Sequence, residues 1–148
     1  MRVEISDNIK YIGASVYDLD LFESQYIIPN GMAYNSYVIL DDKIAVMDTA
    51  DKLVADEWLD NLKTALDGRT PDYLIVQHLE PDHSGNIKSV LELYPEVKLV
   101  CSAKAKAMLP QFADVNEEQI ITKNEGDTLE LGSHTLTFIM APMVHWPE

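Results

Sequence analysis

Apolar and polar positions alternate along the chain in short blocks that predict strands and helices in turn. Residues 37–40 and 44–48 are two β-rich runs around a polar turn, which predicts a pair of strands. In residues 54–66 the apolar positions recur every three or four residues and the run stops at Gly68, which predicts an amphipathic helix. The segment before these elements is also β-rich, so the N-terminal part is predicted to be β-structure.

The rest of the chain continues to alternate between element types. Residues 72–77 and 97–102 are short continuous apolar runs, typical of buried strands, whereas residues 86–95 and 103–113 show helical periodicity. Three further β-rich segments follow, at residues 119–123, 127–132 and 134–143. This order predicts an α/β domain with a mixed sheet flanked by helices.

Length and composition agree with one globular domain that has a real core. The chain has 148 residues, of which 47% are hydrophobic and 24% charged. Its formal net charge of −14 would repel nucleic-acid phosphates and anionic membrane surfaces. We therefore expect neither nucleic acid nor a membrane as a partner.

Cysteine content and hydropathy bear on the cellular compartment. Cys101 is the only cysteine, which excludes an internal disulfide and suits a reducing environment. No stretch reaches the roughly 18 apolar residues that a membrane helix needs, and the first 13 residues lack the apolar core of a signal peptide. These features predict a cytoplasmic protein.

The stretch "QHLEPDHSGN" gathers four metal-capable side chains directly after the apolar run 72–77. In α/β sheets, ligands bind at the carboxyl ends of strands. Alternation in an extended segment would send His78, Glu80 and Asp82 to one side, and His83 would turn toward them as the loop enters the next helix. A multivalent cation would neutralise the crowded carboxylates, so the stretch predicts a metal site.

The ligand types restrict the metal. Two imidazoles and two carboxylates without a thiolate suit iron, manganese or zinc, and the carboxylate share favours iron or manganese. His145 follows another apolar strand and is a further candidate ligand, although a histidine beside a tryptophan is usually a packed polar residue. Asp48 ends the strand 44–48 and could orient the ligands by hydrogen bonds or simply cap its loop. His134, beside a Gly-Ser turn, is interpreted as an exposed hairpin histidine without a role.

Together these motifs resemble the flavodiiron proteins, also called A-type flavoproteins. "HLEPDHSG" is similar to the metal motif of that family, and Glu80 stands where hydrolytic relatives of the superfamily usually have histidine. "YNSYVI", "MDTA" and "APMVHWPE" match as well, and so does the spacing from His83 to His145. The resemblance covers essentially the whole chain.

The resemblance implies a fold, a cofactor set and a reaction. The fold would be the N-terminal half of a metallo-β-lactamase-like αββα sandwich. His78, Glu80 and His145 would bind one iron, and Asp82 and His83 would bind the other. In the family, two irons and FMN serve to reduce O2 to water or NO to N2O. A bridging aspartate, a further histidine and a flavodoxin-like FMN domain come later in the chain, so residues 1–148 are expected to be the N-terminal portion of the di-iron domain.

Several expectations follow from this interpretation. The chain stops just after an apolar segment, and half a sandwich leaves an apolar sheet face open, so we expect a homo-oligomer or a complementary C-terminal fragment. The chain alone is expected to be inactive, and a rubredoxin or a reductase is expected as electron donor. The alternatives are an oxygen-binding or sensing di-iron module and a metal-free fragment. A zinc hydrolase is disfavoured by Glu80.

Overall fold

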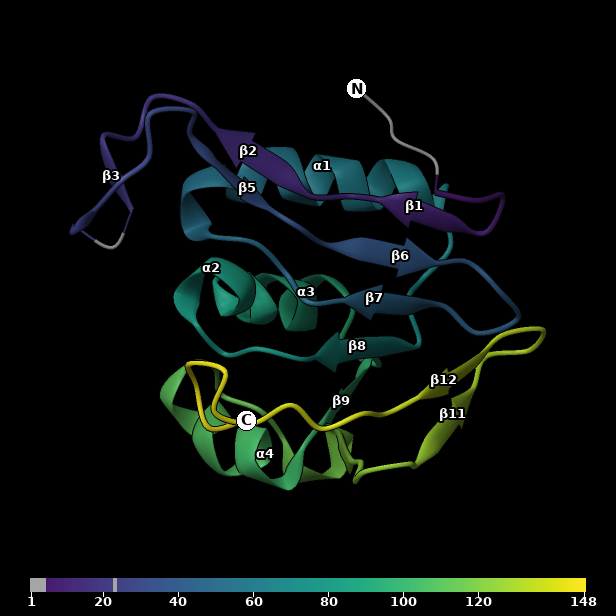
Figure 1. Ribbon diagram of the computed structural model, residues 1–148. Helices are drawn as coiled ribbons and strands as arrows, with labels where there is room; N and C mark the ends of the chain where they lie inside the picture. The colour runs from purple at the N-terminus through teal and green to yellow at the C-terminus, as the bar shows by residue number, and fades with distance from the viewer. Residues whose placement is uncertain (1–4, 23) are drawn as a thin grey trace.

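The computed structural model describes residues 5–22 and 24–148, so residues 1–4 of the stretch used for the signal-peptide prediction lie outside it. Its centre is a six-stranded mixed sheet (Figure 1). In spatial order its strands are β1 (Ile9–Tyr11), β6 (Tyr37–Ile39), β7 (Ala45–Met47), β8 (Tyr73–Val76), β9 (Lys98–Cys101) and β10 (Ile120–Thr122). The pairs β1–β6 and β6–β7 are antiparallel, whereas β7, β8, β9 and β10 run parallel.

Four helices connect or follow these strands, together with short 3-10 turns. They are α1 (Ala55–Leu66), α2 (Pro81–Ser84), α3 (Ile87–Leu93), α4 (Ala103–Met108), η1 (Lys52–Val54), η2 (Leu109–Gln111) and η3 (Glu117–Gln119). Three two-stranded ladders complete the described residues: β2 (Ala14–Val16) with β5 (Met32–Tyr34), β3 (Leu21–Phe22) with β4 (Tyr26–Ile27), and β11 (Thr128–Glu130) with β12 (Thr135–Thr137). No helix among the described residues is long and apolar enough to cross a lipid bilayer.

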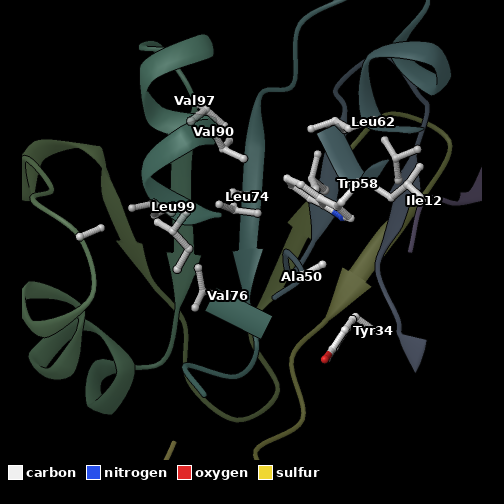
Figure 2. Packing of buried hydrophobic residues seen from close by; sticks show 14 of the residues in the cluster. Ile12, Tyr34, Ala50, Trp58, Leu62, Leu74, Val76, Val90, Val97 and Leu99 are labelled. Carbon is white, nitrogen blue, oxygen red and sulfur yellow. The ribbon is translucent and has the colours of Figure 1, made fainter. Parts of the chain in front are cut away.

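The main core lies between the central sheet and the helices. The sheet register puts Val38, Val46, Leu74 and Leu99 side by side in neighbouring strands, and all four are fully buried. Because side chains alternate along a strand, these four point to the same face. Figure 2 shows Leu74 and Leu99 of this face in one buried cluster with Trp58 of α1 and Val90 of α3. The buried face of α1 that the periodicity predicts therefore forms part of the other side of the core.

The opposite face of the sheet is covered by the β11–β12 hairpin. A second, smaller buried cluster forms there around Ile75, Val100 and Leu131. Asp41, in the turn between β6 and β7, fastens the hairpin because its carboxylate accepts hydrogen bonds from the Ser133 backbone N–H (3.1 Å) and the His134 backbone N–H (2.7 Å). The helices therefore lie on one face and the hairpin on the other.

The predicted helices and strands form, and three of the predictions need correction. The segment 134–143 is regular strand only over Thr135–Thr137. His134 is not a free hairpin histidine, because its Nδ1 lies 2.6 Å from the Asp41 carboxylate and its side chain is 32% exposed. Residues 81–84 are helical rather than extended, because proline at the first helical position favours a helix start.

Candidate metal centre

The candidate site lies where parallel strands end at the same edge of the sheet. The strands β7 and β8 pair in parallel, with Met47 opposite Ile75. The loop after β7 begins at Asp48 and the loop after β8 begins at Gln77, so these loops emerge side by side. The carboxyl edge of a parallel sheet is where backbone groups and side chains converge on ligands.

Asp48, the first residue of the loop after β7, joins that loop to the loop after β8 through hydrogen bonds. Its Oδ1 accepts hydrogen bonds from the backbone N–H of Gln77 (2.7 Å) and of His78 (3.3 Å), and its Oδ2 accepts one from the Gln77 side chain (3.1 Å). Burial raises the pKa of the Asp48 carboxyl, whereas the Gln77 hydrogen bonds and the His83 imidazole oppose that rise. Asp48 therefore holds the start of the loop that carries the cluster.

A second set of contacts fastens the far end of the same loop. The Thr49 hydroxyl donates to the His83 carbonyl (2.7 Å), and the Asn86 side chain donates to the Ala50 carbonyl (2.8 Å). At Gly85 an added Cβ would lie 2.9 Å from that Ala50 carbonyl oxygen and 2.8 Å from the Pro81 carbonyl oxygen. Glycine is thus required for the close approach of the two backbones. Asn86 is the N-cap residue of α3, but its side chain makes no cap hydrogen bond and donates to the Ala50 carbonyl instead.

Three of the predicted ligands meet at one point. Glu80 Oε2 lies 2.9 Å from His78 Nε2 and 2.8 Å from His145 Nε2, and the two imidazole nitrogens lie 2.9 Å apart. His145 reaches this point from the segment after β12, 67 residues along the chain. Glu80 is largely buried, whereas the His145 side chain is 59% exposed, so the cluster opens toward solvent on the His145 side.

Asp82 and His83 lie beside this triangle on α2. Their side chains contact each other, with His83 Nε2 3.5 Å from Asp82 Oδ2. Asp82 Oδ1 and His83 Nδ1 are buried and have no hydrogen-bond partner among the described residues. Burial raises the pKa of the Asp82 carboxyl, the nearby Glu80 adds to this rise, and the His83 and His78 imidazoles oppose it. The structure therefore brings all five predicted ligands to one edge of the sheet, as three converging residues and an adjacent pair.

The sequence interpretation missed Glu148. Its side chain is 1% exposed, and its Oε1 lies 3.0 Å from His78 Nδ1 and 2.9 Å from the Leu79 backbone N–H. Trp146 packs edge-on against the His78 ring, with ring centroids 5.5 Å apart. The only signal was the "HWPE" string next to His145, and nothing in that string indicates contact with His78.

The donor set fits a metal ion on geometric grounds. For an ion held at about 2.1 Å, neighbouring ligand atoms lie roughly 3.0 Å apart in an octahedral site and roughly 3.4 Å apart in a tetrahedral one. The separations of 2.8 to 2.9 Å among His78, Glu80 and His145 are nearer the octahedral value. An imidazole nitrogen that carries no proton and an ionised carboxylate oxygen each offer a lone pair to a cation, so all three converging atoms are of ligand type. Asp82 Oδ1 and His83 Nδ1 are buried without a hydrogen-bond partner among the described residues, and a second cation would supply the missing partner.

Comparisons with known proteins show which family this chain resembles. The model of the ODP family beta lactamase matches residues 32–148. The diflavin flavoprotein A 1 of Synechocystis is 40% identical over 145 residues, which are 97% of this chain and 25% of that protein. A nitric oxide reductase of Moorella thermoacetica is 34% identical over 148 residues, covering 99% of this chain and 37% of that protein.

Solved structures show the same fold. The rubredoxin oxygen:oxidoreductase of Desulfovibrio gigas superposes with a TM-score of 0.91 at 31% identity, over 99% of this chain and 37% of that one. The flavodiiron protein of Giardia intestinalis has a TM-score of 0.91 at 26% identity, over 99% of this chain and 36% of that one. The chain thus spans between a quarter and two fifths of the length of these relatives. Its fold is that of the N-terminal metallo-β-lactamase-like part of flavodiiron proteins, and the chain belongs to the ODP beta-lactamase family.

Proposed function

We propose that this chain is the N-terminal part of the di-iron domain of a flavodiiron oxidoreductase that reduces O2 to water, NO to N2O, or both. The observation that carries the proposal is the meeting of His78 Nε2, Glu80 Oε2 and His145 Nε2 within 4.8 Å of one another. The relatives support both substrates, because one is named a nitric oxide reductase and another a rubredoxin oxygen:oxidoreductase.

The five side chains divide into two ligand groups. His78, Glu80 and His145 would hold one iron, and Asp82 with His83 would contribute to the second. Iron held by these residues would supply electrons and Lewis acidity for the reduction of a diatomic molecule. The His145 side chain is 59% exposed and leaves the cluster open to small molecules on that side, whereas the Glu80 side chain is largely buried.

The reaction needs electrons that this set of residues does not store. Reduction of O2 to two waters takes four electrons and four protons, and reduction of two NO to N2O and water takes two of each. We propose that FMN, on a further flavodoxin-like segment or on another chain, delivers these electrons, and that a rubredoxin-type protein or a reductase supplies the flavin. By this proposal residues 1–148 alone bind metal without turning over O2 or NO.

Apolar surface near the site supports association with another chain. Ile139, Met143 and Val144 are 78%, 73% and 80% exposed. A cavity of about 410 Å³ opens beside them, between the sheet and the segment after β12. We propose that a second copy or a complementary C-terminal fragment packs on these exposed apolar residues in a cytoplasmic assembly. A dilute monomer that stays stable in light scattering would contradict this part of the proposal.

Ferrous iron titration under anaerobic conditions tests the ligand assignment. The wild-type chain is expected to bind ferrous iron, and Glu80→Gln or His145→Ala is expected to weaken binding by at least tenfold, because the first removes the charge of a carboxylate ligand and the second removes an imidazole donor. His134→Gln is the matched control, since it removes a histidine outside the cluster. Equal affinity in all four proteins would overturn the assignment.

Activity assays on the same protein preparation distinguish the proposed reductase from a sensing module and from a hydrolase. After addition of an FMN-containing complementary fragment, O2 or NO should be consumed together with reductant. A reversible spectral change without reductant consumption would instead identify a sensing module. Zinc content with lactamase or esterase activity would identify a hydrolase.

A further inference from the structure

Glu148 makes contacts that no ligand assignment explains. Its side chain is 1% exposed, and its Oε2 is buried without a hydrogen-bond partner among the described residues, so Oε1 makes the contacts of the carboxylate. A carboxylate buried to this degree must be hydrogen-bonded to be tolerated. Its Oε1 meets two groups of the loop after β8, the His78 ring nitrogen Nδ1 at 3.0 Å and the Leu79 backbone N–H at 2.9 Å.

The geometry points to Glu148 as a positioning residue that selects the tautomer of His78. A carboxylate accepts and does not donate, so Glu148 Oε1 favours the neutral His78 ring that carries its proton on Nδ1, whereas Glu80 Oε2, 2.9 Å from Nε2, favours the other tautomer. In the tautomer that Glu148 favours, the lone pair is on Nε2, the nitrogen that lies 2.9 Å from both Glu80 Oε2 and His145 Nε2. A hydrogen bond from the outer nitrogen of a ligating histidine to a carboxylate also fixes the orientation of the ring.

Two further contacts restrict the ring. The hydrogen bond from Leu79 fixes the carboxylate relative to the backbone that carries His78, so the two move as one unit. The indole of Trp146 stands edge-on to the imidazole at an interplanar angle of 79° and blocks one direction of rotation. Residues 146 and 148 come from the same segment as His145, so one short segment supplies a candidate ligand and also orients another.

The tautomer can be read in the metal-free chain by long-range 1H–15N correlation of histidine-labelled protein at pH 8. The His78 signals are assigned by their loss in His78→Gln. The wild-type chain is expected to populate the Nδ1–H form of His78, and Glu148→Leu is expected to shift the population toward the Nε2–H form, because Glu80 Oε2 then remains as the carboxylate acceptor beside the ring. Glu96→Gln, an exposed charge neutralisation, is the control and should match the wild type.

Glu148→Gln keeps the side-chain volume and a hydrogen-bond acceptor, and it tests the same inference if Glu148→Leu fails to fold. A hydrogen bond to a neutral amide is weaker than one to a carboxylate, so the Nδ1 proton signal of His78 should move upfield. Retention of the wild-type tautomer in Glu148→Leu, or an unmoved proton signal in Glu148→Gln, would overturn the inference.

Ferrous iron affinity gives the second measurement. Loss of an outer hydrogen-bond partner of a ligating histidine typically costs about 10- to 100-fold in metal affinity, which is the loss expected for Glu148→Leu relative to Glu96→Gln. This part rests on the proposed function for the identity of the metal. If the wild-type chain binds no iron, the proposed function fails while the tautomer measurement still decides the role of Glu148.

Discussion

Replacement of Asp48 separates the contribution of its hydrogen bonds from that of its backbone conformation. The residue has φ +53°, in the left-handed region, and its carboxylate holds the start of the loop with the candidate ligands. Asp48→Gly removes the carboxylate and leaves the backbone unstrained, because glycine occupies this region freely. Asp48→Ala removes the same carboxylate and adds the steric conflict of a Cβ at positive φ.

The expected magnitudes follow from the three contacts. The 2.7 Å bond from the Gln77 backbone is the strongest, the 3.3 Å bond from His78 is weaker, and the Gln77 side chain is exposed and can turn to water. Asp48→Gly should therefore lower the free energy of unfolding by about 2 kcal/mol, and Asp48→Ala by about 3 kcal/mol. Asp48→Asn should stay within about 1 kcal/mol, because asparagine tolerates positive φ and keeps an acceptor.

Urea unfolding of the metal-free chain, followed by circular dichroism and tryptophan fluorescence, measures all three variants. The order wild type, Asn, Gly, Ala is the expected order of decreasing stability. If the glycine variant were as stable as the wild type, the hydrogen bonds of Asp48 would contribute nothing. If Asp48→Asn lost as much unfolding free energy as Asp48→Ala, the negative charge of Asp48 rather than its acceptor geometry would account for its contribution to stability.

Three further predictions concern the thiol, the hairpin and the core. Burial raises the pKa of the Cys101 thiol to about 11, so a thiol reagent at pH 8 should label it slowly in the native chain and rapidly in urea, and rapid native labelling would contradict this. The hydrogen bond from His134 lowers the pKa of the Asp41 carboxyl well below its ordinary 3.8. The stability that this hydrogen bond contributes is present above pH 3.8 and is lost as the pH falls toward the pKa of the folded state. Below pH 3.8 the urea midpoint should therefore drop more steeply in the wild type than in Asp41→Asn, and parallel curves would exclude the effect. Leu74→Ala, at a fully buried position, should cost about 2 to 5 kcal/mol of unfolding free energy, whereas Leu53→Ala, 65% exposed, should change it by no more than about 0.5 kcal/mol.

Local patterns in the sequence were sufficient for the element types and for most of the core. The three- and four-residue spacing of Trp58 and Leu62 predicted the buried face of α1, and both are fully buried. The density of histidines and carboxylates in residues 78–83 also indicated a site, because residues so close in the chain remain close in any fold. The error at residues 81–84 arose because strand alternation was extended past Pro81, which instead begins a helix.

Only the tertiary structure decided which distant groups meet. His145 was a candidate on resemblance, but its approach to within 2.9 Å of His78 depends on the path of the segment after β12. The contact of Glu148 with the far side of the same imidazole, and the pairing of His134 with Asp41, depend on that path too. Periodicity encodes which face of an element is buried, whereas contacts between residues far apart in the chain depend on sheet order, register and loop direction, which side-chain packing of the whole domain determines.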